Sequence, residues 1–486
     1  MAKASAAYSC SSVSSMTRPG RQKRSARPAL IPFNEAGAKM SNPRWSIRSF
    51  VLLAALSTAL LLSAWARPPQ QIAQQQLDVE RGLRPAPRSW WKPSQQAKLS
   101  LTDRMAFHHV PGVSLAVIDG GRVAWARGYG FLHAGNDARV STETLFQAAS
   151  ISKAVTATAA MMLVQDGRLS LDRPVNDTLR SWKVPAASPD LSADVTLRQL
   201  LSHTAGIGVP GYLGYPAGQP VPRLLDVLRG AAPATSPAVR VERPAGRAYA
   251  YSGGGYEVLQ LLLQETGGEP FPGLMQRRLL QPLGMTHSTF TSPLPETWRQ
   301  RAAEAHSAAG QPLPGRWHTY PELAAAGLWS TPSDLARWLL ALSGSANAAN
   351  NALLNQATMR EMLTDHTPGL ARWYSGHAYS LGLKLRGRGQ AFSFGHTGIN
   401  QGYRAVAVMY PRTGQGAVVM TNGENGEALA QEILRSVAAA YHWPDEPPGR
   451  GAELIWLPVA SLVLLGLLRA YPPRKRGRHS LKFSSS

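Results

Sequence analysis

Cysteine is almost absent from this chain of 486 residues, since Cys10 is the single one. An intrachain disulfide is therefore impossible, and so is a zinc site built from several cysteines. Histidines do not fill that role, because His108 and His109 form the only adjacent pair and no H-E-x-x-H or comparable ligand spacing occurs. The sequence therefore predicts no metal and no organic cofactor.

Acidic residues are also scarce, with 29 Asp and Glu against 51 Lys and Arg, which gives a formal net charge of +22. Most of this excess lies at the two ends, because residues 1–66 carry +8 and residues 469–486 carry +6. Between them, no basic helix and no basic patch interleaved with aromatic residues stands out. A nucleic-acid-binding protein concentrates positive charge on its folded domain, so this distribution argues against nucleic acid as a partner.

Apolar runs of the roughly 20 residues that span a bilayer as a helix are lacking, but two shorter runs occur. Residues 50–66 follow two arginines and end in Ala-Trp-Ala, so we interpret them as a signal peptide or signal-anchor. Residues 454–468 precede the basic tail 469–486 and are predicted to form a C-terminal transmembrane helix, with a buried core helix as the alternative. Because Lys/Arg-rich flanks stay in the cytoplasm, the intervening domain is expected to face the periplasm or cell exterior.

The rest of the chain divides by composition. Residues 1–49 form a basic N-terminal region, which a translation start at Met40 would shorten to ordinary signal length. Residues 67–98, rich in Pro, Arg and Gln, are predicted to be a linker, and residues 99–443 a single folded domain. The middle of this domain (168–370) is mainly helical, and a last helix is predicted at 427–441. Strand signals lie on both sides of the helical middle. The predicted strands are 113–118, 123–126, 380–385, 391–395, 403–410 and 417–421. The pattern predicts an α+β fold with one antiparallel sheet built from both ends of the domain.

The most informative residues are Ser150 and Lys153, a Ser-x-x-Lys pair at the start of a helical pattern that Gly167 ends. Residues three apart on a helix share a face, so the hydroxyl and the amine are predicted to lie side by side, next to the backbone N–H groups of the helix start. A serine needs a nearby base to become a nucleophile, and a neutral lysine can be that base. The pair therefore predicts a serine acyl-transferring enzyme; the alternative is a serine at a helix start with a solvated lysine.

Two comparisons within the sequence bear on this pair. A second Ser-x-x-Lys, from Ser89 to Lys92, lies in a Pro/Arg-rich stretch without helical periodicity, and we interpret it as accidental. Between Leu99 and Gly451 the chain has just three lysines, Lys153, Lys183 and Lys384, although arginine is common. Arginine cannot give up its proton, so a lysine at position 153 favours a chemical role.

Three further segments stand out. Tyr251 precedes the glycine run 253–255, where backbone can approach a ligand closely. His396-Thr397-Gly398 follows the predicted strand 391–395, and the segment 200–206, with His203, ends a short helical pattern. Each segment alone is weak evidence for a catalytic function. A histidine such as His203 more often has a structural role.

Taken together and in this order, the motifs over 99–443 resemble the serine β-lactamase-like family, which includes class C β-lactamases, DD-peptidases, D-aminopeptidases and β-lactamase-fold esterases. The resemblance rests on Ser150-x-x-Lys153, the segment 200–206, Tyr251 in a Tyr-x-Asn position, Ala325-Ala326-Gly327-Leu328 before a helix, and His396-Thr397-Gly398 in a Lys-Thr-Gly position. It implies a β-lactamase/DD-peptidase-like fold and no cofactor. No Ser-Asp-Asn triplet occurs, so the class A arrangement is not supported.

The resemblance also implies roles for individual residues. Ser150 would be the acylated nucleophile, Lys153 and Tyr251 would exchange its proton, and either could be the general base. His396, with Thr397 and Gly398, would bind the substrate, and the N–H groups of Ser150 and Ile399 would form the oxyanion hole.

Two departures from the family pattern bear on the substrate. His396 replaces a lysine, and Gly253 replaces the asparagine that normally helps to hold the substrate's amide. We therefore expect a membrane-anchored serine hydrolase acting on an ester or amide, of esterase or D-amino-acid peptidase type. The alternatives are a β-lactamase and a catalytically weak penicillin-recognising membrane protein.

Overall fold

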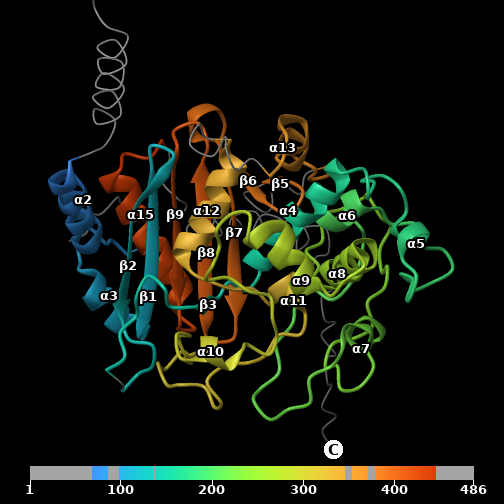
Figure 1. Ribbon diagram of the computed structural model, residues 1–486, viewed down its shortest axis with the longest axis horizontal. Coiled ribbons are helices and arrows are strands. Elements are labelled where there is room, and N and C mark those ends of the chain that lie inside the picture. The colour runs from blue at the N-terminus through green and yellow to red at the C-terminus, as the bar shows by residue number, and fades with distance from the viewer. Residues whose placement is uncertain (1–67, 86–97, 136, 345–352, 370–377, 445–486) are drawn as a thin grey trace, which may run out of the picture. The chain divides into compact units, whose positions relative to one another are not determined.

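The computed structural model describes residues 68–85, 98–135, 137–344, 353–369 and 378–444 (Figure 1). The predicted signal or anchor at 50–66, the apolar run at 454–468 and both basic ends lie outside these residues. Within the described part, no helix is both long and apolar enough to cross a membrane.

The centre of the domain is a seven-stranded sheet in the order β2-β1-β9-β8-β7-β6-β5, with every paired neighbour antiparallel. Its strands are β1 (Gly112–Asp119), β2 (Arg122–Gly130), β5 (Ala378–Tyr379), β6 (Lys384–Arg386), β7 (Ser393–Asn400), β8 (Tyr403–Tyr410) and β9 (Gln415–Thr421). The first strand therefore pairs with the last, which confirms the α+β fold with a sheet made from both ends of the domain. A second, two-stranded sheet joins β3 (Phe146–Gln147) to β4 (Trp329–Ser330).

Three strand predictions differ from the structure. The strand predicted at 123–126 is too short, because β2 pairs with β1 as far as Gly130. The strand predicted at 391–395 continues to Asn400, because its pairing with β8 runs up to the tight turn where Asn400 meets Tyr403. His396, Thr397 and Gly398 therefore lie inside a strand rather than after one. The strand predicted at 380–385 is interrupted instead, because Gly382 adopts a φ of 92° and separates β5 from β6.

The two faces of the sheet pack against different helices, as the alternation of side chains along a strand requires. Val113, Leu115 and Val117 of β1 join one core cluster with α15 (Gly426–Ala440). Ala116 and Ile118 join the other, which contains α4 (Ile151–Gln165) and α12 (Pro332–Ser343). Figure 1 shows α12 in front of the strands.

Short helices fill the middle of the chain, as the sequence predicts. They are α3 (Leu101–Phe107) before β1, then α5 (Val175–Thr178), α6 (Leu197–Leu201), α7 (Leu224–Arg229), α8 (Gly254–Gly267), α9 (Phe271–Met275), α10 (Glu296–Arg299), α11 (Leu323–Ala326) and α13 (Gln356–Met362). A π-turn, Gln276–Leu280, extends α9. Of these, α6, α8 and α11 carry or support residues of the site described below.

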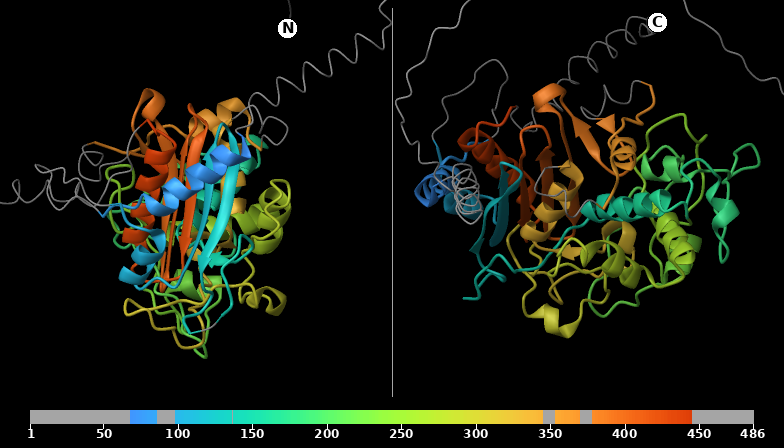
Figure 2. Two further views of the ribbon diagram at one scale, coloured as in Figure 1. Left: turned by 90° about the vertical axis from the view of Figure 1, so that its left-hand side faces the viewer. Right: turned by 45° about the horizontal axis from the view of Figure 1, so that its top comes forward.

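The linker predicted at 67–98 is wrong over part of its length. Residues Pro69–Arg81 form the helix α2, which lies beside α15 (Figures 1 and 2). Val79 and Leu83 are fully buried in the cluster around α15, and the hydroxyl of Ser436 donates a hydrogen bond to the carbonyl oxygen of Val79 at 2.7 Å. These few apolar contacts, rather than the polar composition, decide the structure of this segment.

Candidate active site

Ser150 lies at the turn between β3 and α4, directly before the first residue of the helix. The turn is sharp, because Ala149 adopts a φ of 50°, a left-handed conformation that costs energy for any residue but glycine. The backbone N–H of Ser150 thus lies at the N-terminal end of α4, where backbone donors have no partner within the helix. This is the place that an oxyanion-binding N–H requires.

The structure brings Ser150 and Lys153 together as predicted. The Nζ atom of Lys153 lies 3.2 Å from Ser150 Oγ and 2.8 Å from the carbonyl oxygen of Ala325. Only 2% of Lys153 is exposed, so its amine serves these two partners rather than the solvent.

The acceptor Ala325 belongs to α11, and two side chains of α8 hold this short helix in place. Glu257 Oε1 accepts a hydrogen bond from the N–H of Ala325 at 3.2 Å, and Gln260 Oε1 accepts one from the N–H of Ala324 at 3.0 Å. Burial raises the pKa of Glu257 well above its usual value. Its role was not predicted, although a titratable residue among the apolar side chains of α8 is a signal that could have drawn attention to it.

Tyr251 lies next to Lys153. The Nζ atom of Lys153 is 5.0 Å from the centre of its ring, and the ring of the buried His203 packs on it with a centroid distance of 4.3 Å. The ring of His396 is 6.3 Å from that of Tyr251. Burial lowers the pKa of His203 well below its usual value, and the nearby Lys153, His396 and Lys384 act in the same direction.

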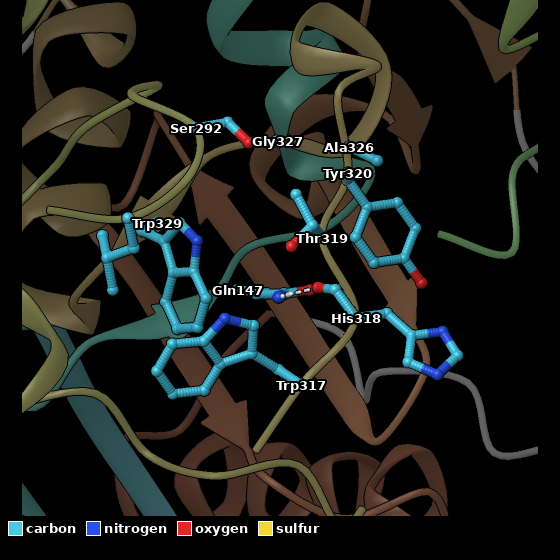
Figure 3. A pocket seen from close by; sticks show the side chains of 10 residues that line it. Gln147, Ser292, Trp317, His318, Thr319, Tyr320, Ala326, Gly327 and Trp329 are labelled. Atoms are coloured by element: carbon cyan, nitrogen blue, oxygen red, sulfur yellow. Dashed lines mark hydrogen bonds between the residues drawn. The ribbon is translucent and has the colours of Figure 1, made fainter. Parts of the chain in front are cut away.

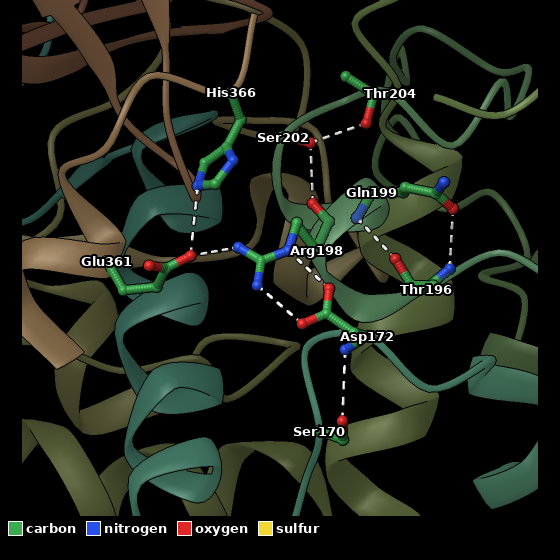
Figure 4. Close-up of polar contacts among 9 residues, drawn as sticks. All are labelled: Ser170, Asp172, Thr196, Arg198, Gln199, Ser202, Thr204, Glu361 and His366. Carbon is green, nitrogen blue, oxygen red and sulfur yellow. Dashed lines mark hydrogen bonds and ion pairs between the residues drawn. The ribbon is translucent and has the colours of Figure 1, made fainter. Parts of the chain in front are cut away.

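The segment that carries His203 is anchored by a polar cluster around Arg198 of α6 (Figure 4). The guanidinium of Arg198 binds Asp172 through two hydrogen bonds of 2.7 and 2.8 Å and also pairs with Glu361. At the end of α6, the hydroxyl of Ser202 donates to the carbonyl oxygen of Arg198 at 2.8 Å. These contacts fix α6 and the turn in which His203 has a φ of 58°.

Strand β7 lies directly against the Ser150 turn. A Cβ atom added to Gly398 would come within 3.0 Å of the carbonyl oxygen of Ala148, closer than real side chains come to a backbone oxygen. A glycine is therefore needed at this position. Ile399, the next residue, is 54% exposed, and the assignment of its N–H to the oxyanion hole stays a prediction.

Thr397 has a partner that the sequence did not single out. The ammonium of Lys384, on the neighbouring strand β6, lies 3.0 Å from Thr397 Oγ1. Burial lowers the pKa of Lys384. Its rarity in an arginine-rich domain is the one sequence signal that pointed to it.

The space normally taken by an asparagine side chain at position 253 is occupied by an aromatic ring. A Cβ atom on Gly253 would lie 2.9 Å from Cε2 of Tyr212. The hydroxyl of Tyr212 and both carboxylate oxygens of Glu322 are buried and have no hydrogen-bond partner among the described residues. Burial raises the pKa of Glu322 to about 8.

A small pocket beside α11 is too small to be a substrate site (Figure 3). It is lined by Gln147, Trp317, Tyr320 and Ala326, among others, and its volume is about 10 Å³. That is room for about one water molecule. In the part of the chain that the structure describes, no three His, Cys, Asp or Glu side chains cluster as a metal site would need.

This arrangement agrees with comparisons to known proteins. A family model described as Beta-lactamase matches residues 100–442. The chain belongs to the β-lactamase family. Its members are serine hydrolases, so the resemblance seen in the motifs is confirmed at the level of fold and enzyme class.

The relatives of this β-lactamase-family chain are distant. Penicillin-binding protein 4 of Amycolatopsis lactamdurans is 28% identical over 369 residues, covering 73% of this chain and 93% of that protein. The octameric penicillin-binding protein homologue from Pyrococcus abyssi is 25% identical with a TM-score of 0.58, covering 70% of this chain and 75% of that one. SurE, solved with D-Leu, is 26% identical with a TM-score of 0.55, and the match covers 70% of this chain and 74% of SurE.

Proposed function

We propose that this serine hydrolase cleaves an ester or amide through a covalent acyl-enzyme on Ser150, and that it is of esterase or D-amino-acid peptidase type. The observation that carries the proposal is the 3.2 Å contact between Lys153 Nζ and Ser150 Oγ at the start of α4. A nucleophile and a base in direct contact are the minimum for covalent catalysis.

The contacts of Lys153 support it as the base for acylation. A neutral amine has two N–H groups and one lone pair, so one N–H can donate to the carbonyl oxygen of Ala325 while the lone pair accepts the proton of Ser150. Ser150 Oγ then bonds to the substrate's carbonyl carbon. The N–H groups of Ser150 and Ile399 stabilise the oxyanion, and each such donor contributes roughly 3 kcal/mol.

Breakdown of this intermediate completes the cycle. The leaving group takes a proton from Tyr251 or Lys153 as its bond to the carbonyl carbon breaks. Water then attacks the acyl-enzyme and gives a proton to the base that protonated the leaving group. As the bond between the carbonyl carbon and Ser150 Oγ breaks, Oγ takes a proton back from Lys153, which releases the acid and restores Ser150.

Lys384 favours the peptidase type over a simple esterase. Its ammonium, 3.0 Å from Thr397 Oγ1, is a cation beside the residues that the family uses for substrate binding. A terminal carboxylate of a D-amino acid is the kind of group that an ammonium and a hydroxyl hold together. SurE was solved with D-Leu, which supports a D-amino acid as the recognised unit.

One experiment tests the nucleophile. The purified domain is labelled with a fluorophosphonate and with a fluorescent penicillin, and the modified residue is mapped. Ser150→Ala should abolish labelling, whereas Ser89→Ala, the matched control in the other Ser-x-x-Lys, should leave it intact. Labelling that survives Ser150→Ala would refute the proposal, and labelling without turnover of any ester or amide would support a penicillin-recognising protein instead.

We also propose that the chain is anchored in a membrane with this domain outside the cytoplasm. The support is the sequence alone: the apolar runs 50–66 and 454–468 and their basic flanks. A reporter active only outside the cytoplasm should work when fused after Trp443 and fail when fused after Ser486. Activity at both fusion points would contradict the C-terminal span.

A further inference from the structure

The single helical turn α11 is held between the two helices that begin at the active site. Helix α4 begins directly after Ser150, and α8 begins shortly after Tyr251. Both helices reach α11 with polar side chains, whereas α11 itself consists of Leu323 and three alanines. Since these aliphatic side chains cannot make hydrogen bonds, the position of α11 depends on bonds to its backbone.

One alanine of α11 connects Glu257 of α8 to the catalytic lysine. Glu257 Oε1 accepts a hydrogen bond from the N–H of Ala325 at 3.2 Å, and the carbonyl oxygen of Ala325 accepts one from Lys153 Nζ at 2.8 Å. Among the described residues, this carbonyl oxygen and Ser150 Oγ are the hydrogen-bond partners of the amine. A shift of Ala325 would therefore move the amine relative to the hydroxyl that it must deprotonate.

Ala324 is held in the same way but does not reach the catalytic pair. Its N–H donates to Gln260 Oε1 at 3.0 Å, and its carbonyl oxygen accepts from the hydroxyl of Thr156 at 3.4 Å. Glu257 and Gln260 are both buried, with 0% and 3% of their surfaces exposed. The two side chains of α8 thus have the same structural role, and they differ in whether the alanine that they hold also binds Lys153.

The surroundings of Glu257 keep its carboxyl group uncharged. The side chain is fully buried, and its second oxygen, Oε2, has no hydrogen-bond partner in the part of the chain that the structure describes. Burial raises the pKa of Glu257 well above its usual value, and the nearby Glu322 acts in the same direction. The N–H of Ala325 and the amine of Lys153 oppose this rise with smaller effects.

The other ionisable groups that act on Glu257 supply no positive charge. Glu322 lies at the start of α11, and burial raises its pKa to about 8. Burial raises the pKa of Tyr212 well above its usual value, so both groups are neutral at pH 7. A carboxylate at Glu257 would pair with Lys153 and keep that lysine protonated. An uncharged Glu257 instead leaves Lys153 able to accept the proton of Ser150.

We propose that Glu257 is a positioning residue that works as an uncharged acid. It holds Ala325 so that the carbonyl oxygen aims Lys153 at Ser150, and it gives Lys153 no counter-ion. The inference rests on the proposed function of Ser150 and Lys153. It assigns the control of the base to a side chain that lies behind α11 and contacts neither reacting atom.

The test compares Glu257→Gln, Glu257→Leu and Gln260→Leu in the full chain. A glutamine keeps the acceptor oxygen and carries no charge, as neutral glutamic acid does, so kcat and the pH profile of kcat/KM should match wild type. A leucine at position 257 leaves the N–H of Ala325 without its acceptor. We expect kcat of Glu257→Leu for the best ester substrate to fall about 10- to 100-fold, the effect of a small misplacement of reacting groups.

The pH profile separates positioning from a loss of stability. Lys153 must be neutral to act as a base, so activity falls at acid pH as its amine becomes protonated. In Glu257→Leu the ammonium form of Lys153 loses its carbonyl acceptor and gives up its proton more readily, so the acid limb of kcat/KM moves to lower pH. Gln260→Leu removes an equally buried bond and should lower the melting temperature similarly, while its acid limb stays in place. Equal kinetics and pH profiles of the two leucine variants overturn the inference.

Carbon NMR of the glutamate-labelled wild-type chain provides a readout independent of activity, and Glu257→Gln assigns the signal. The expected signal is that of a protonated carboxyl group, unchanged between about pH 5 and pH 7, where an ordinary glutamate with a pKa of about 4.3 is ionised. A carboxylate signal at pH 7, or an acid limb that moves in Glu257→Gln, overturns the inference. The expected signal in a chain that is not labelled at Ser150 refutes the proposed function instead.

Discussion

Gly398 and the carbonyl oxygen of Ala148 approach each other so closely that no side chain fits between β7 and the turn that carries Ser150. Because the strand and the turn are in backbone contact, the spacing between the predicted oxyanion donors depends on a single missing Cβ atom.

Gly398→Ala should therefore reduce kcat/KM on the order of 10²-fold, the effect of losing one oxyanion donor, while the domain stays folded. Gly211→Ala is the matched control, since a Cβ atom there meets nothing within 4 Å. Steady-state kinetics with a p-nitrophenyl ester, together with circular dichroism, measure both. Equal activity of the two variants would contradict a tight fit at Gly398.

Lys153→Arg places a permanent positive charge at this position and removes the ability to accept a proton at working pH. We expect a loss of activity of about 10²-fold or more, the usual scale of general-base catalysis. Lys183→Arg should be nearly silent, because Lys183 only donates to carbonyl oxygens of Asn176 and Leu179. Near-normal turnover by Lys153→Arg would show that the lysine is structural.

The aromatic ring on Gly253 predicts how substrate preference can be changed. Gly253→Asn alone should impair the enzyme, because Tyr212 occupies the space that the new side chain needs. Combined with Tyr212→Ala, the same asparagine has room and supplies the amide that grips a substrate amide. We expect the double variant to be acylated by penicillin at least about tenfold faster than wild type. The ratio of kcat/KM for a chromogenic cephalosporin and a p-nitrophenyl ester checks the result; an unchanged ratio would show that Gly253 does not set the preference.

Glu322 makes the stability of the domain fall as the pH rises from about 4.3 to about 8. Its pKa is raised to about 8 in the folded state, against about 4.3 in an unfolded chain. The folded state thus holds the proton more tightly, so its stabilising contribution is complete below about pH 4.3 and is lost as the pH rises towards 8. Glu322→Gln should raise the free energy of unfolding at pH 8 by roughly 1–2 kcal/mol, which appears as a melting temperature that is a few degrees higher. The melting temperature at pH 4 should change little. Glu296→Gln, at a 79% exposed side chain, is the control.

The buried ion pair of Arg104 and Glu432 makes the free energy of unfolding decrease at acid pH. The two side chains are 8% and 4% exposed and lie 2.6 Å apart. Burial alone would raise the pKa of Glu432, but hydrogen bonds from Arg104 and His108 outweigh it and lower the pKa. The stability from this carboxylate is therefore present above about pH 4.3 and lost as the pH falls further.

Arg104→Ala should destabilise the domain by about 3–5 kcal/mol, because it leaves a buried charge unpaired. The matched control is Arg223→Ala, at an ion pair with an 89% exposed arginine, which should change stability by less than about 1 kcal/mol. Urea unfolding at pH 7 and pH 4 measures both. Equal effects of the two substitutions would show that burial does not strengthen the first pair.

Local signals explain what the sequence predicted well. The glycine turn between β1 and β2, the helix start at Ser150 and the hydroxyl cap of Thr331 on α12 are each set by neighbouring residues. The order of motifs then placed Ser150, Lys153 and Tyr251 in one site. The length of β7 was missed because its last residues are held by pairing with β8 rather than by their own propensity.

Contacts between distant segments account for the other misses. Lys384 and Thr397 meet because β6 and β7 are neighbours, and Tyr379 joins two histidines that lie 193 residues apart in the chain. The spacing of residues along the sequence does not indicate such contacts. The aromatic ring over Gly253 comes from a loop with no periodic pattern, so a missing asparagine was visible but its replacement was not.

The helix α2 has a practical consequence for anyone who prepares this enzyme. The family match begins at residue 100, and a fragment cut there would leave out Val79 and Leu83, which cover α15. The apolar face of α15 would then be exposed to solvent, and exposed apolar patches promote aggregation. A soluble recombinant fragment should therefore begin before Pro69, and a leader removed after Ala66 would leave this cover intact.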